Sequence, residues 1–221
     1  PALNVLEAQL LLESGKPAVA AVLFDSLSHQ FSAISAPSQR ARTAGWMLTQ
    51  SLGARIAAGD TGTAGKLVDS LRALGEQSGF GRDRRLHHYI RGLLLSARGS
   101  DDAAIEELKA AMFAPTTGFT RTNFELGRLY LKTRRPREAV AILQPALRGS
   151  IDASNLYVSR TELHERLAQA WEAAGGPVEK GNREGAGGHL KVTAHPERLA
   201  TMAQLLKDLK EKRFSVLDAR S

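Results

Sequence analysis

TNFELGRLYLKTRRPREAVAILQPALRG, residues 122–149, predicts two short helices joined by a tight turn. Apolar residues recur in each half with the three- and four-residue spacing of one helix face. Pro136 suits the first turn of the second helix, because the N–H that proline lacks has no partner there. Pro145 should bend or end the same helix early. The stretch is therefore predicted to form a helical hairpin.

Small residues stand where the two helices of this hairpin would touch. They are Gly127, Ala139 and Ala146. Small side chains let neighbouring helix backbones approach closely, and larger apolar residues then fill the space around them. The larger residues here are Leu126, Tyr130 and Leu143.

The same arrangement recurs in units that start near residues 1, 45, 85, 120 and 161. The fifteenth position of each unit holds a turn residue: Gly15, Gly59, Gly99, Arg134 and Gly175. The seventeenth holds a residue that suits a helix start: Pro17, Thr61, Asp101, Pro136 and Pro177. The twentieth position of the first four units is alanine. This shared register indicates a stack of helical hairpins.

Composition favours an all-helical protein. Aromatic residues make up 5% of the 221 residues, while alanine and leucine are abundant, and strands prefer aromatic and β-branched side chains. The expected helices cover about 2–14, 17–29, 38–58, 61–77, 83–98 and 101–113, followed by the two helices of residues 122–149. A further helix is expected from about residue 161.

Residues 122–149 resemble a tetratricopeptide repeat (TPR). Leu126, Gly127 and Tyr130 occupy the seventh, eighth and eleventh positions of that pattern, and Ala139 and Ala146 occupy its close-packing positions. The stretch from about 85 to 175 is similar to the helical-repeat regions of multidomain bacterial regulators, such as serine/threonine kinases and transcriptional activators. The resemblance implies an all-α superhelix of TPR-like hairpins that binds proteins and has no catalytic activity.

The fifth unit departs from the pattern after its first helix. Lys180 occupies the alanine position, and the glycine-rich stretch EKGNREGAGG, residues 179–188, cannot sustain a helix. We therefore expect a repeat domain over 1–175, a flexible linker over 176–195, and an amphipathic helix with a tail over 196–221. Because the chain begins at Pro1, in the middle of the pattern and without Met, we also expect it to be part of a longer protein.

The C-terminal helix is expected to present one apolar face, formed by Leu199, Met202, Leu205, Leu206 and Leu209. A flexible segment over 175–188 would reach roughly 20 Å, enough to return this helix to the last hairpin. Three uses follow: capping the array in place of the missing second helix, exchanging onto another copy of the chain, or occupying the groove. The remaining alternative is a disordered or artificial tail.

In TPR arrays the first helix of each hairpin lines a concave groove, usually through positions 2, 5, 9, 12 and 13. Applied to the third and fourth units, this rule predicts a partner-binding groove formed by Tyr89, Leu93, Arg121, Phe124, Arg128, Leu131 and Lys132, with Leu86 and Ser96 beside them. The arginines and the lysine would pair with peptide carboxylates, and the aromatic rings would serve as apolar anchors. The alternative is ordinary packing of the aromatic residues and a solvated basic face.

No catalytic, cofactor or metal site is expected. GDTGTAGK, residues 59–66, has the wrong glycine spacing for a phosphate-binding loop and is interpreted as a hairpin turn with Thr61 as helix cap. His164 lacks the second histidine of a metalloprotease helix, and the chain has no cysteine. The acid pairs Asp101/Asp102 and Glu106/Glu107 are interpreted as helix-start and solvent-facing residues.

We therefore predict a non-catalytic protein–protein interaction scaffold in the cytoplasm, part of a larger regulatory protein. No run approaches 18 apolar residues, so no membrane segment is expected. The net charge of +7 and the pI near 10 support one alternative, a nucleic-acid-associated regulatory domain. The charges are spread along the chain without a basic run, so a protein or peptide partner is preferred over nucleic acid.

Overall fold

The computed structural model describes residues 2–30, 36–112, 121–147, 158 and 160–175, and in this part of the chain every regular element is helical. The elements are α1 (Ala2–Glu13), α2 (Pro17–Gln30), α3 (Pro37–Ala57), α4 (Thr61–Ser78), the 3-10 helix η1 (Asp83–Arg85), α5 (Leu86–Ala97), α6 (Asp101–Ala111), α7 (Arg121–Lys132), α8 (Pro136–Ala146) and α9 (Arg160–Ala173). The helices lie within a few residues of the expected ranges. The predicted linker over 176–195 and the helix over 196–221 lie outside the described residues.

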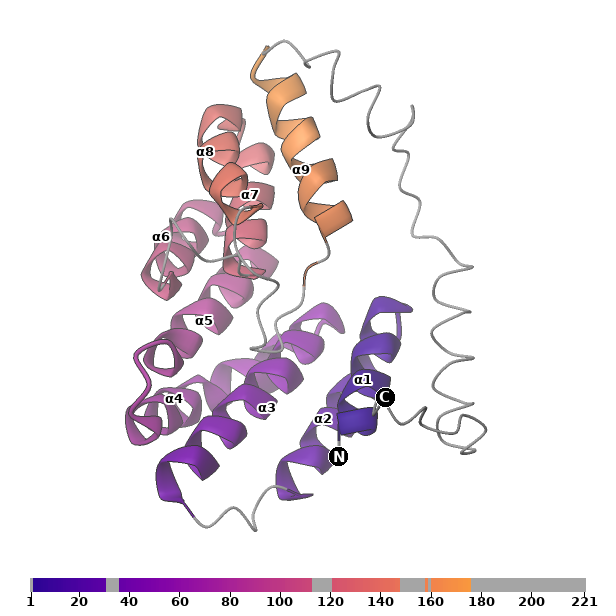
Figure 1. Cartoon of the computed structure of the whole chain (residues 1–221), viewed down its shortest axis with the longest axis vertical. Coiled ribbons are helices and arrows are strands. Elements are labelled where there is room, and N and C mark those ends of the chain that lie inside the picture. Colours follow the sequence, from indigo (N-terminus) through magenta and orange to yellow (C-terminus); the bar gives the residue numbers. More distant parts are fainter. Residues whose placement is uncertain (1, 31–35, 113–120, 148–157, 159, 176–221) are drawn as a thin grey trace, which may run out of the picture.

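The helices form consecutive hairpins, α1 with α2, α3 with α4, α5 with α6 and α7 with α8, and α9 follows as the last helix. Each hairpin packs on the next through α2 and α3, α4 and α5, α6 and α7, and α8 and α9. Figure 1 shows the resulting curved stack, with α3, α5 and α7 on the inner side and α4, α6 and α8 outside them. The fold is the predicted all-α superhelix of TPR-like hairpins.

The turn of every hairpin is left-handed at the fifteenth repeat position. The φ angles there are 77° for Gly15, 86° for Gly59, 79° for Gly99, 60° for Arg134 and 69° for Gly175. Glycine adopts this region without the steric penalty of a Cβ atom, so its recurrence in the sequence is explained by the turn. Arg134 keeps the same turn geometry despite carrying a side chain.

The helix starts agree with the sequence except at one cap. Pro17 and Pro136 are the first residues of α2 and α8, as predicted, and Pro145 lies one residue before the end of α8. The interpretation of Thr61 as a cap is wrong. The side chain of Asp60 accepts a hydrogen bond from the backbone N–H of Thr63, 3.1 Å away, and therefore caps α4.

Two glycines bring paired helices into close contact. A Cβ atom added to Gly92 in α5 would lie 2.6 Å from Cγ of Leu108 in α6. At Gly127 in α7 the same atom would lie 2.7 Å from Cγ of Leu143 in α8. The third and fourth hairpins thus repeat one contact, in which a leucine of the second helix packs directly on a glycine of the first helix. The small-residue pattern predicted such close contacts.

The apolar core runs along the stack. One buried cluster extends from α3 through α9, and a second joins α1, α2 and Ala54 of α3. Between the second and third hairpins, the buried Trp46 donates its indole N–H to Oδ1 of the buried Asp83 over 2.9 Å. This bond ties α3 to η1 and so sets the start of α5.

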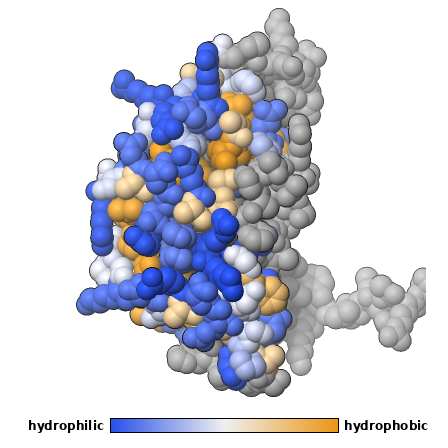
Figure 2. All heavy atoms as spheres, turned by 90° about the vertical axis from the view of Figure 1, so that its left-hand side faces the viewer, coloured by the Kyte–Doolittle hydropathy of each residue, from blue (hydrophilic) through white to orange (hydrophobic). Residues whose placement is uncertain are grey.

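The outer side is mainly polar. Figure 2 shows the side on which α4 and α6 lie, where hydrophilic side chains cover most of the surface and apolar residues form small separate groups. Large exposed apolar side chains occur mainly at the two ends of the stack, and Phe80, between α4 and η1, is a further one. Examples at the ends are Val19 and Val22 of α2 and Trp171 of α9.

Candidate functional site: the inner groove

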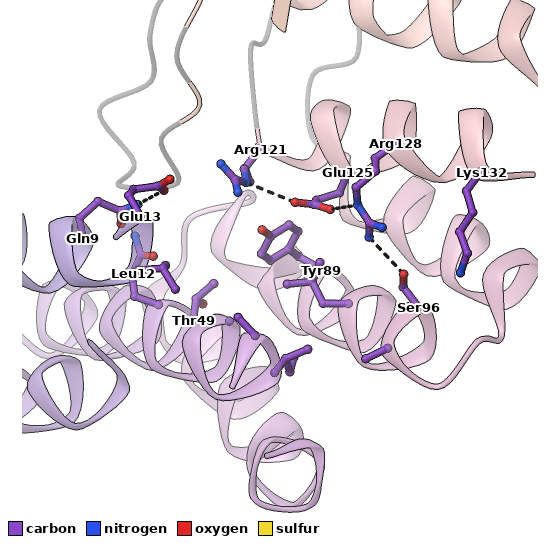
Figure 3. A pocket seen from close by; sticks show the side chains of 16 residues that line it. Gln9, Leu12, Glu13, Thr49, Tyr89, Ser96, Arg121, Glu125, Arg128 and Lys132 are labelled. Atoms are coloured by element: carbon purple, nitrogen blue, oxygen red, sulfur yellow. Dashed lines mark hydrogen bonds and ion pairs between the residues drawn. The ribbon is translucent and has the colours of Figure 1, made fainter. Parts of the chain in front are cut away.

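The inner side of the stack holds a pocket of about 430 Å³. Its lining comes from α1, α3, α5 and α7, the first helices of all four hairpins (Figure 3). The residues are Gln9, Leu12, Glu13, Thr49, Gln50, Gly53, Ile56, Ala57, Tyr89, Leu93, Ser96, Ala97, Arg121, Glu125, Arg128 and Lys132. We refer to this pocket as the inner groove.

The lining follows the repeat register. In the first three units it consists of residues at positions 5, 9, 12 and 13, apart from Gln50, and these positions lie on one side of a helix. Gln50 and Glu125 both occupy the sixth position. The lining residues of α1 and α3 were missed because the groove rule was applied only to the third and fourth units. The same rule counted from residues 1 and 45 identifies Gln9, Thr49 and Gly53.

Five of the seven predicted residues lie in this pocket: Tyr89, Leu93, Arg121, Arg128 and Lys132. Phe124 and Leu131 lie outside it. Phe124 is buried, with the guanidinium of Arg121 5.1 Å from its ring centre and that of Arg166 in α9 5.2 Å away. Leu131 is half-buried and packs against the main core.

Phe124 differs from its counterpart in α5, Tyr89, because of what lies next to each helix. Tyr89 borders open space, whereas α7 packs directly against α9. The side chain of Phe124 is therefore covered by the neighbouring helix. Of the two additional expectations, Ser96 lines the groove, and Leu86 is buried in the core.

The positive charges of the groove have acidic partners within the chain. Glu125, nearly buried, accepts from Nε of Arg121 over 3.3 Å and from Nε of Arg128 over 2.9 Å. Arg128 also donates to Oγ of Ser96 over 3.1 Å. The ammonium group of Lys132 lies 2.8 Å from Oδ1 of Asp101, at the start of α6. A ligand carboxylate would have to replace these carboxylates to reach the cations.

Arg121 and Tyr89 form the centre of the groove, as Figure 3 shows. Burial raises the pKa of the Tyr89 hydroxyl, and the nearby charge of Glu125 raises it further. Burial tends to lower the pKa of Arg121, but Tyr89, Glu125 and Glu13 together raise it above its usual value. Glu13 belongs to α1, so the first and fourth hairpins interact electrostatically across the groove. Arg121 stays charged and Tyr89 stays neutral at physiological pH.

Two of the four acids noted in α6, Asp101 and Glu107, contact neighbouring helices. Asp101 pairs with Lys132, and Glu107 of α6 lies 2.7 Å from Nδ1 of His88 and 3.2 Å from a guanidinium nitrogen of Arg91 in α5. Within the described ranges, no three His, Cys, Asp or Glu side chains converge on a possible metal position. Among the described helices, none is long and apolar enough to cross a membrane.

The groove is chemically suited to hold a chain segment. Part of its lining is apolar, mainly from Leu12, Ile56 and Leu93, and polar or charged side chains surround these residues. Gly53 leaves open space above α3, because a Cβ atom built there meets nothing within 4 Å. An extended backbone could use the polar groups while its side chains contact the apolar floor.

No protein-family model matches the chain, and no curated protein matches it. Two solved structures resemble it, both of a putative kinesin light chain with nearly identical TPR-like repeats from Podosopora anserina, one of them a variant. Each is 16% identical, with a TM-score of 0.47 and an alignment that covers 95% of either chain. A similarity at this level indicates nothing about what the groove binds.

Proposed function

We propose that this chain is a non-catalytic scaffold that binds a peptide or protein segment in its inner groove. The observation that supports this function is the pocket shared by α1, α3, α5 and α7, which collects the same repeat positions from four hairpins. Superhelical repeat arrays create extended concave surfaces of this kind. The scaffold works in the cytoplasm as part of a larger regulatory protein, and residues 196–221 cap the array or mediate self-association.

The charges of the groove favour a ligand with few carboxylates. Glu125 already holds Arg121 and Arg128, and Glu13 adds a second negative charge from the facing helix. Leu12, Ile56 and Leu93 of the lining offer apolar contacts instead. The preferred ligand is therefore an extended peptide with apolar side chains and little net charge.

The alternative, a nucleic-acid-associated domain, depends on the net charge of +7. The groove does not favour it, since its cations are paired with carboxylates of the same chain. Phosphate binding requires cations that can release counterions, and it weakens steeply with salt. A protein partner is the better match to the inner surface.

A random-peptide library selected against the full chain tests this function. Gly53→Arg places a long side chain in the groove, and its Cβ atom meets no neighbour within 4 Å. Gly62→Arg in α4 is the matched control, since Gly62 is equally open and lies outside the groove. Selected peptides should bind the original chain and the Gly62→Arg variant alike, and the Gly53→Arg variant about tenfold more weakly, a difference of about 1.4 kcal/mol.

Equal binding to the Gly53→Arg and Gly62→Arg variants would show that the groove is not the binding surface. Binding measured at low and at high salt tests the alternative function, a nucleic-acid-associated domain. Binding of single-stranded DNA or RNA that is lost steeply with salt would favour the nucleic-acid domain. Peptide binding through apolar contacts should change little over the same range.

A further inference from the structure

Helix α9, the last of the described helices, has an uncovered face that the equivalent helices bury. In α7 the eighth and eleventh positions are Gly127 and Tyr130, and α8 covers both, so that Tyr130 is only 6% exposed. The equivalent residues of α9 are Ala168 and Trp171. Both are exposed, Trp171 at 39%. The face that a second helix covers in the fourth hairpin is thus open in the fifth.

The remaining side of α9 is packed. Leu163, Leu167 and Ala170 are buried, and α9 contacts α7 and α8. Position four shows the same contrast as positions eight and eleven, because Asn123 of α7 is buried whereas His164 of α9 is exposed. We call the surface formed by His164, Ala168 and Trp171 the open face. A large tryptophan next to a small alanine is a suitable surface for a packed helix.

The sequence of residues 196–213 contains the apolar spacing of a second helix. In α8 the fully buried residues are Ala139, Leu143 and Ala146, separated by four and three positions, and Leu143 lies against Gly127 of α7. Met202, Leu206 and Leu209 repeat these separations. Their side chains are larger, so the helix over 196–213 would lie further from α9 than α8 lies from α7. This larger separation leaves room for Ala168, which replaces the glycine found in α5 and α7.

The length of the connecting segment and the charges of residues 196–213 agree with a position of this segment beside α9. A flexible chain as long as residues 176–195, which number 20, would span about 25 Å. The 14-residue helix α9 is about 21 Å long, so the segment can return alongside it. In an antiparallel arrangement the basic end, with Lys207, Lys210 and Arg213, lies beside the first half of α9, which carries Glu162 and Glu165.

We propose that residues 196–213 dock as a helix on the open face of α9 in the same chain, antiparallel to α9 and with Leu206 against Ala168. The docked helix completes the fifth hairpin and covers Trp171. This inference specifies the proposed capping role of the C-terminal segment and does not depend on the ligand of the inner groove. Failure of the peptide-binding experiment would leave it intact.

Cysteine cross-linking in the full chain tests the docking, because the chain contains no cysteine of its own. Ala168→Cys is combined with Leu206→Cys and treated with a short thiol cross-linker at micromolar concentration. The matched control combines Ala168→Cys with Gln204→Cys, which lies on the opposite side of the predicted helix. The 168/206 pair should form a link several-fold faster than the 168/204 pair, because docking places residue 206, and not residue 204, next to residue 168. Both links should be intramolecular at micromolar protein, since a tether gives a millimolar effective concentration.

Three results would overturn the proposal. Equal rates for the two pairs would mean that the segment does not dock on the open face. Cross-linked dimers in place of monomers would assign the segment to a second copy. A faster link between Val22→Cys and Leu206→Cys would place the helix on the exposed apolar residues of α2, at the other end of the stack.

Tryptophan fluorescence provides a second measurement without cysteines. Leu206→Asp should undock the helix, so that Trp171 emission moves several nanometres to the red and acrylamide quenches it more strongly. Trp171→Phe isolates the signal of the other tryptophan, Trp46, which is buried and should not respond. An unchanged Trp171 signal in the Leu206→Asp variant would contradict the docking.

Discussion

Gly127 in α7 lies so close to Leu143 in α8 that a Cβ atom on the glycine would be 2.7 Å from Cγ of the leucine. The contact recurs between Gly92 and Leu108 in the preceding hairpin. Both leucines are fully buried. The glycine and leucine positions are thus coupled through direct contact, and substitutions at the two positions should not act independently.

Gly127→Ala should lower the free energy of unfolding by about 1 kcal/mol. Overpacking against Leu143 costs about 1–3 kcal/mol and outweighs the gain of about 1 kcal/mol in helix propensity. Urea denaturation measures the difference. Gly53→Ala in α3 is the control, since open space surrounds Gly53 and the variant should be as stable as the original chain or more stable. In a Leu143→Ala background, Gly127→Ala should lose its penalty; an unchanged penalty would contradict the contact.

Arg134→Gly should stabilise the chain by about 1 kcal/mol. Arg134 has φ of 60°, a conformation that costs an L-residue about 1–2 kcal/mol and that glycine adopts freely. The reciprocal variant, Gly99→Arg, places the same side chain at φ of 79° and should lose a similar amount. Thermal denaturation compares the two. A lower melting temperature for Arg134→Gly would show that the arginine side chain outweighs the turn strain.

Trp46→Phe should cost about 2–3 kcal/mol, because it removes the hydrogen bond donor of the buried Asp83. Asp83→Asn should cost less, since an amide oxygen can still accept from the indole N–H. Urea denaturation followed by circular dichroism measures both variants. If Asp83→Asn proved the more harmful, the pair with Arg42, 4.0 Å from the carboxylate, would be the more important contact.

Stability should fall on acidification partly because of His87. Burial lowers the pKa of His87 from its usual value, and the positive charges of His88, Arg91 and Arg72 lower it further. The unfolded chain therefore binds the proton more readily, so the contribution is present above about pH 6.5 and is lost as the pH falls below that value. His87→Gln should flatten the stability profile between about pH 7.5 and 5.5 in urea titrations. If the stability of the His87→Gln variant fell equally steeply with pH, groups other than His87 would be responsible for the loss.

Glu125→Gln should reduce stability by about 1–2 kcal/mol, because it leaves Arg121 and Arg128 without the carboxylate between them. Added salt should recover part of the loss by screening the two guanidinium groups. Glu138→Gln is the matched control: its pair with Arg135 over 2.9 Å is exposed and should contribute less than about 1 kcal/mol. Equal losses of stability in the two variants would show that the charge of Glu125 stabilises the chain no more than an exposed carboxylate does.

Much of the fold could be predicted because its signals are local. Gly99 predicts a turn and Pro136 predicts a helix start. Both signals depend only on the few residues next to them in the chain. The cap of α4 was assigned to the wrong one of two adjacent residues, because both Asp60 and Thr61 can cap a helix. The groove was predicted in part: the repeat register identified Tyr89 and Arg128, and extending it to the first two units would have added Gln9 and Thr49.

By itself, the sequence determined the helices, their turns and the order in which they stack, because glycine, proline and small-residue positions act through the adjacent backbone. Only the tertiary structure decided which side chains share a groove and which charges remain available there. Arg121 lies in the field of Glu13, Arg128 donates to Ser96, and Phe124 is covered from α9. These relationships join helices far apart in the sequence, and they depend on the curvature of the whole stack, which no local spacing specifies.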